Sequence, residues 1–78
     1  MKELDEFMEV YDAASGSRPL YMSLKEIKTG KPRWRIQVLE KSTATIGGDM
    51  EIIFAEKPTK EECLREGTRK LKKYLRIA

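Results

Sequence analysis

The chain has 78 residues and a mass of 9.1 kDa, so we expect residues 1–78 to form a single compact domain. Its 16 Lys and Arg against 13 Asp and Glu give a formal charge of +3. It has no His and one Cys, Cys63. This composition excludes a Ser-His-Asp triad, a histidine-bearing metal site, an internal disulfide and a zinc cage. We therefore expect no metal site and no cofactor.

The hydropathy pattern favours a cytoplasmic protein that does not enter a membrane. No apolar stretch approaches the ~20 residues that span a bilayer. Residues 1–12 are acidic and lack the apolar region of a signal peptide. A reducing compartment also suits the unpaired Cys63.

The first segment has the periodicity of an amphipathic helix over residues 2–14. Its apolar residues fall at i, i+3, i+4 and i+7, and they are Leu4, Phe7, Met8 and Tyr11. Acidic residues occupy the opposite face. The segment 15–19, which contains Gly16 and Pro19, ends this helix.

Three segments alternate in the manner of strands, over residues 20–28, 33–41 and 50–56. Residues 29–32 form a turn and 42–49 a polar loop. At Glu26-Ile27 the alternation slips, which indicates a bulge or a strand end. The residues expected on one apolar sheet face are Leu20, Met22, Leu24, Trp34, Ile36, Val38, Met50, Ile52 and Phe54.

The last helix is predicted over residues 60–76 by its start signal. Thr59 followed by Glu62 is a capping box. Its apolar arc consists of Leu64, Leu71, Tyr74 and Leu75, with Cys63 and Gly67 at the edge. We expect Cys63 to be a small core residue. Because Gly67 costs about 1 kcal/mol of helix propensity relative to Ala, we expect a close packing partner there.

The element order predicts an α+β fold of the type α-β-β-β-α. Short connections favour a three-stranded antiparallel meander. Each helix has one apolar stripe to bury, so both helices should pack on the same face of the sheet.

The charge is distributed in blocks, and this distribution yields two candidate binding clusters. Residues 1–17, 18–35, 36–64 and 65–78 carry net charges of −4, +5, −3 and +5. The first cluster lies on the hairpin, where basic residues beside an aromatic suit nucleic acid. Its residues are Tyr21, Lys25, Lys28, Lys31, Arg33, Arg35 and Gln37. Basic residues on strands also protect sheets from edge-to-edge aggregation, which is the structural alternative.

The second cluster is a basic stripe on the last helix. Its residues fall at i, i+4, i+7 and i+11, and they are Arg65, Arg69, Lys72 and Arg76. A charged solvent face is typical of any surface helix, and basic residues near a C-terminus also suit the helix dipole. The hairpin therefore ranks ahead of this stripe as the working surface.

No catalytic constellation is present in the sequence. Gly47-Gly48 lacks the rest of a phosphate-binding loop, and no two carboxylates are singled out for acid–base work. We therefore expect no catalytic residues and no enzymatic activity.

Two family resemblances bear on function. The α-β-β-β-α order resembles the double-stranded RNA-binding domain, and residues 58–64 look like the start of its last helix. That family binds phosphates through a basic run at this point, whereas Glu61 and Glu62 are acidic.

The second resemblance covers residues 31–75, from the strand Arg33-Trp34-Arg35-Ile36-Gln37-Val38 to the helix opening at Thr59. This stretch is similar to the arm-site DNA-binding domain of phage-type tyrosine recombinases and to related plant-type domains. In those proteins the open sheet face enters the major groove. The resemblance implicates Tyr21, Lys25, Arg33, Arg35 and Gln37.

Two functions remain open at this point. One is a small nucleic-acid-binding protein that contacts DNA or RNA through the open sheet face. The other is a phage or mobile-element protein that binds and inhibits or modulates a host protein, such as a nucleic-acid enzyme. Uncovered cations at Lys25, Arg33 and Arg35 would favour nucleic acid. Neutralisation by Glu51 and Glu56 across the strands would favour a protein partner.

Overall fold

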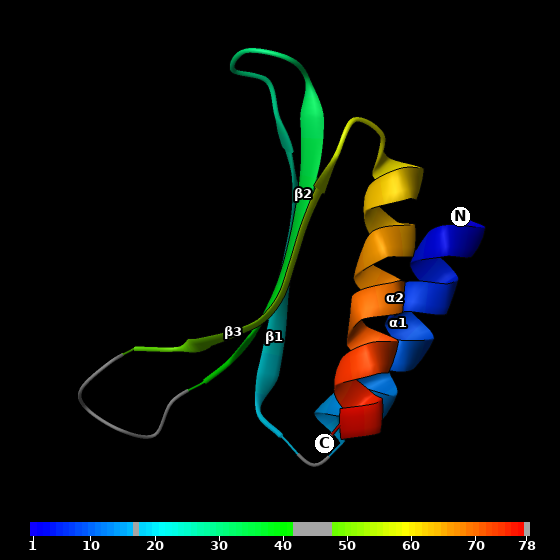
Figure 1. Cartoon of the computed structure of the whole chain (residues 1–78), viewed down its shortest axis with the longest axis vertical. Coiled ribbons are helices and arrows are strands. Elements are labelled where there is room, and N and C mark those ends of the chain that lie inside the picture. The colour runs from blue at the N-terminus through cyan, green and yellow to red at the C-terminus, as the bar shows by residue number, and fades with distance from the viewer. Residues whose placement is uncertain (17, 42–47, 78) are drawn as a thin grey trace.

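The computed structural model describes residues 1–16, 18–41 and 48–77. The elements are α1 (Lys2–Ser15), β1 (Leu20–Ile27), β2 (Arg33–Glu40), β3 (Met50–Lys57) and α2 (Lys60–Ile77) (Figure 1). The predicted α+β class and the order α-β-β-β-α are confirmed. Most of the predicted loop over residues 42–49 lies outside the described residues.

β2 is the central strand of the sheet and pairs antiparallel with β1 and β3. The β1–β2 ladder is regular from Leu20 opposite Glu40 to Ile27 opposite Arg33. The slip in alternation at Glu26-Ile27 therefore marks the end of β1 and not a bulge. Gly30 has a φ of 73° in the turn that follows, a backbone conformation that glycine adopts without strain.

The β2–β3 ladder contains an irregularity that reverses the expected orientation of β3 from Ile53 onward. Ile53 lies opposite Val38, whereas Glu51 lies opposite the next β2 residue, Leu39. Ile52 is therefore an extra residue on β3. Ile53 and Ala55 are buried on the helix-covered face. The prediction that Phe54 faces the core is wrong, because Phe54 pairs with Gln37 on the open face and is 37 % exposed. Met50, which was also expected in the core, is 65 % exposed at the start of β3.

Both helices lie on one face of the sheet and run in the same direction, and the other face is open (Figure 1). α2 covers β2 and β3, while α1 packs mainly on α2 and only lightly on β1. The Tyr11 hydroxyl donates to the Leu20 carbonyl at 3.0 Å, which ties α1 to β1. The predicted two-helix layer on a three-stranded sheet is confirmed.

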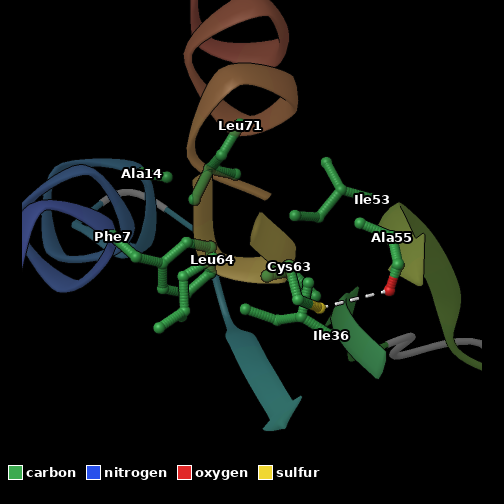
Figure 2. Packing of buried hydrophobic residues seen from close by; sticks show 9 residues of the cluster. Phe7, Ala14, Ile36, Ile53, Ala55, Cys63, Leu64 and Leu71 are labelled. Atoms are coloured by element: carbon green, nitrogen blue, oxygen red, sulfur yellow. Dashed lines mark hydrogen bonds between the residues drawn. The ribbon is translucent and has the colours of Figure 1, made fainter. Parts of the chain in front are cut away.

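The core lies between the sheet and the two helices (Figure 2). Phe7 of α1, Ile36 of β2 and Leu64 of α2 are fully buried. Gly67 lies at their junction: a Cβ there would lie 3.1 Å from Ile36 Cγ2 and 3.3 Å from Phe7 Cε2. The expected close packing at Gly67 is confirmed. Cys63 is also fully buried, as expected of a small core residue.

The start of α2 has the predicted capping box. The Glu62 amide donates to Thr59 Oγ1 at 3.2 Å, and the Thr59 hydroxyl donates to Glu62 Oε1 at 3.0 Å. These contacts satisfy an amide that the first turn would otherwise leave unpaired. Neither helix, over its described residues, is long and apolar enough to cross a membrane.

Candidate binding surfaces

The first candidate is the open face of the sheet, which carries the hairpin cluster. Cross-strand partners share a face of an antiparallel sheet. Lys25 pairs with Arg35, and Ile27 pairs with Arg33. The structure thus brings together five of the cluster residues on the open face, namely Tyr21, Lys25, Arg33, Arg35 and Gln37. Lys28 and Lys31 are exposed beside them in the turn 28–32.

Glu56 neutralises both arginines of this cluster. Its Oε1 lies 2.8 Å from Arg33 Nε, and its Oε2 lies 2.9 Å from Arg35 Nη2. Hydrogen bonds from Arg35 and then Arg33 hold the pKa of Glu56 below its ordinary value. Two of the three open-face cations are therefore paired with one carboxylate.

Arg33 also holds the turn between β1 and β2. Its Nη1 donates to the Thr29 carbonyl at 2.8 Å and to the Lys31 carbonyl at 3.1 Å. With Glu56 on the same guanidinium, most of its donors are engaged within the chain. Arg33 therefore has a structural role that accounts for its presence.

The polar groups at the other end of the open face are engaged as well. Gln37 Nε2 donates to Glu51 Oε2 at 3.0 Å. The Tyr21 hydroxyl donates to the Asp49 carboxylate, and this bond raises the pKa of Tyr21. Lys25 is the one basic cluster residue on the strands that forms no ion pair within the described residues.

Apolar side chains share the open face with these polar groups. Tyr21 pairs with Leu39. Phe54 pairs with Gln37, which is two residues from Leu39 on β2 and lies on the same face. Tyr21 and Phe54 are 36 % and 37 % exposed. The Arg35 guanidinium lies 5.5 Å from the centre of the Phe54 ring. Phe54 was not a predicted site residue because the uninterrupted alternation of β3 assigned it to the core.

The second candidate is the outward face of α2. The predicted stripe residues are all exposed, and they are Arg65, Arg69, Lys72 and Arg76. Arg69 forms a two-pronged pair with Glu66, at 2.7 Å from Nε and 3.0 Å from Nη2. This pair holds the pKa of Glu66 at about 2. Lys73, which the predicted stripe did not include, is exposed beside these residues.

An open depression separates α2 from the free edge of β3. Its volume is about 560 Å³, and it is lined by Glu51, Ile52, Ile53, Phe54, Arg69, Lys70, Lys73 and Tyr74. Lys70 Nζ crosses it and donates to the Phe54 carbonyl at 2.6 Å. This bond satisfies a carbonyl of an edge strand, which otherwise invites pairing with another chain.

Metal binding and thiol chemistry have little support in the described part of the chain. No group of three or more His, Cys, Asp or Glu side chains is arranged there to hold a metal ion. Burial raises the pKa of Cys63, which disfavours the reactive thiolate.

Comparisons with known protein families, curated protein sequences and solved structures found no match to this chain.

Proposed function

We propose that the chain is a protein-binding module whose partner docks on the open face of the sheet. The observation that carries this proposal is the pairing of Arg33 and Arg35 with Glu56. Two guanidiniums that share a carboxylate present much less positive charge to a phosphate than free ones do. A protein partner requires no such excess of positive charge.

The composition of the open face fits a protein interface. Interface cores are enriched in aromatic residues and Arg, and a few such anchors carry most of the binding energy. Tyr21 and Phe54 are the exposed aromatics of the sheet, and Leu39 lies between the strands that carry them. Arg35 over the Phe54 ring adds a further anchor of the same kind.

The partner's chemistry follows from what surrounds these anchors. An apolar patch is needed opposite Tyr21 and Phe54. An acidic group on the partner would meet Lys25, which has no ion pair in the described chain. Such a partner includes the host nucleic-acid enzymes that small phage and mobile-element proteins inhibit. Nucleic-acid binding through this face remains a prediction, and the Glu56 pairs weigh against it.

The test is affinity capture with three versions of the chain from cells that naturally express it. The wild type should retain a stoichiometric protein partner. The variant Tyr21→Ser/Phe54→Ser should lose that partner, because it removes both exposed anchors while leaving the buried core intact. The matched control Lys72→Gln/Lys73→Gln changes two exposed residues on α2 and should retain it.

Two results would contradict the proposal. One is the absence of any stoichiometric partner for the wild type. The other is a partner that is retained by the Tyr21→Ser/Phe54→Ser variant and lost by the α2 control. Circular dichroism and urea unfolding of all three proteins show whether each is folded.

A further inference from the structure

Several cations on the outward face of α2 form no ion pair within the described residues, in contrast to the hairpin arginines. Lys72, Lys73 and Arg76 are exposed. In the described parts of the chain none of them forms an ion pair. The only acid within residues 65–77 is Glu66, which pairs with Arg69. α2 therefore keeps a larger share of its cations without an ion pair than the hairpin, where Arg33 and Arg35 share Glu56.

These cations form an extended and hollowed surface. From Arg65 to Arg76 the helix advances about 16 Å at 1.5 Å per residue. Besides the depression beside β3, a hollow of about 280 Å³ is lined by Arg69, Lys72, Lys73 and Arg76. A third hollow of about 260 Å³ is lined by Lys57, Glu62, Arg65, Glu66 and Arg69. Arg69 borders all three hollows, so the hollows join along α2 into one shallow surface.

The helix dipole accounts for Arg76, which lies in the last turn of α2, but not for the other cations. Its influence is confined to the last turn of a helix, and α2 ends at Ile77. Lys72 and the more distant Arg65 and Arg69 lie outside that turn. Their charge is left to be explained by solvation alone or by an anionic ligand.

The composition of this surface favours phosphates over the other anionic ligands. Lys is depleted at protein interfaces, which need aromatic or aliphatic anchors, and the outward stripe of α2 carries only charged side chains. A helix that lies in an anionic membrane surface buries an exposed apolar face there, but Leu64 and Leu71 of α2 are buried in the core.

A nucleic-acid duplex fits better than a single strand. Single strands bind where aromatic rings are free to stack with bases. Tyr74, the aromatic residue of α2, has the Arg18 guanidinium 5.6 Å from its ring centre, and its hydroxyl accepts a hydrogen bond from Arg18. Backbone contact without stacking or base readout is the mode of non-specific duplex binding.

We propose that the outward face of α2, from Arg65 to Arg76, binds the phosphate backbone of a nucleic-acid duplex. This surface is separate from the open sheet face, so a single chain can hold a protein partner and a duplex at once. The two proposals rest on different residues, and either can fail alone.

The test is fluorescence anisotropy with a labelled duplex of about 20 base pairs at about 50 and 200 mM salt. The wild type should bind at the lower salt concentration and weaken steeply at the higher one. The variant Lys72→Gln/Lys73→Gln/Arg76→Gln should bind at least about 10-fold more weakly at low salt. Its slope of log affinity against log salt should be shallower by about 2.7, because each lost phosphate contact removes about 0.9.

The matched control is Lys25→Gln/Lys28→Gln/Lys31→Gln, which removes the same three charges from exposed positions on the hairpin. It should keep its affinity within about threefold of the wild type. Urea unfolding of both variants verifies their folding. Equal weakening by both variants would overturn the proposal, because net charge alone would then explain binding. Tighter binding to a single strand, to polyglutamate or to anionic vesicles than to the duplex would also overturn it, as would no binding at low salt.

Discussion

Val38 lies directly opposite Ile53 in the β2–β3 ladder, and both side chains are buried under α2. The next β2 residue, Leu39, faces Glu51, so Ile52 has no partner of its own. This extra residue sets the alternation for the rest of β3. From Ile53 onward the odd-numbered side chains enter the core, and Phe54 is directed to the open face.

Substitutions at Ile53 and Phe54 should therefore differ in cost, although both remove a large apolar side chain. Ile53→Ala should lower the free energy of unfolding by about 2–5 kcal/mol, because it leaves a cavity in the core. Phe54→Ala should cost less than about 1 kcal/mol, because the ring is more than a third exposed. Urea unfolding of the two variants measures both values. A larger loss at Phe54 than at Ile53 would contradict the observed register.

The element order was predictable because each element has a local signal. Trp34, Ile36 and Val38 alternate with polar residues, which indicates a strand. The Thr59/Glu62 capping box is a local motif that marks the start of α2. No local signal shows which side chains of β3 are directed to the core. Met50, Ile52 and Phe54 are more apolar than Glu51, Ile53 and Ala55, so alternation alone selects the wrong face. The bulge that reverses it arises from pairing with β2, which is distant in sequence.

In the candidate surfaces, too, local spacing was predictable from the sequence and long-range pairing was not. Spacing within β2 placed Arg33 and Arg35 on the open face, and helical spacing placed Arg69 on the outward face of α2. The partners of these cations depend on register and could not be predicted. Arg35 meets Glu56 because the two are opposite each other across β2 and β3. From sequence alone the hairpin therefore ranks ahead of α2 as a binding surface, whereas in the structure its two arginines are paired and Lys72, Lys73 and Arg76 of α2 form no ion pair within the described residues.

Gly67 should be intolerant of a side chain. A Cβ would lie 3.1 Å from Ile36 Cγ2, and Ile36 is fully buried, so the core has little room to yield. Overpacking typically costs 1–3 kcal/mol, against a gain of about 1 kcal/mol in helix propensity. We expect Gly67→Ala to lower the free energy of unfolding by about 1 kcal/mol, and Gly67→Val to lower it further.

Gly16→Ala provides the matched control for this substitution. Gly16 has an ordinary helical φ of −63°, and a Cβ there meets nothing nearer than 3.6 Å. Alanine restricts the unfolded chain, so this change should stabilise the protein by about 0.4–1 kcal/mol. Thermal and urea unfolding compare the two. Stabilisation by Gly67→Ala would show that Ile36 and Phe7 move aside at little cost.

The Glu56 pairs should make stability depend on pH in the acid range. The carboxylate accepts hydrogen bonds from Arg35 and Arg33, which lower its pKa in the folded state. The resulting stabilisation is present above the unfolded pKa of about 4.3 and is lost as the pH falls through the lower folded pKa. The stability difference between the wild type and Glu56→Gln should accordingly shrink as the pH is lowered from neutrality into this range.

An NMR titration of the Glu56 carboxyl carbon checks the cause directly. Arg35→Gln and Arg33→Gln each remove a hydrogen bond and a positive charge from Glu56, so each should raise the pKa of Glu56. An unchanged pKa in both variants would mean that the ion pairs do not persist in solution. The open face would then carry free cations, and nucleic-acid binding through it would regain support.

Cys63 should be unreactive in the folded chain. Its side chain is fully buried, and the single thiol proton of Sγ is shared between the Trp34 carbonyl at 3.4 Å and the Ala55 carbonyl at 3.6 Å. Figure 2 shows the contact with Ala55. Burial raises the pKa of the thiol, so little thiolate forms near neutral pH.

Labelling of Cys63 with a disulfide reagent should therefore follow the population of unfolded chain. The destabilised Ile53→Ala variant should label faster than the wild type, and both should label at the same rate in concentrated urea. Equal labelling rates in the absence of urea would instead show that Cys63 is reached through a local opening near the start of α2, one that leaves the Ile53 environment intact.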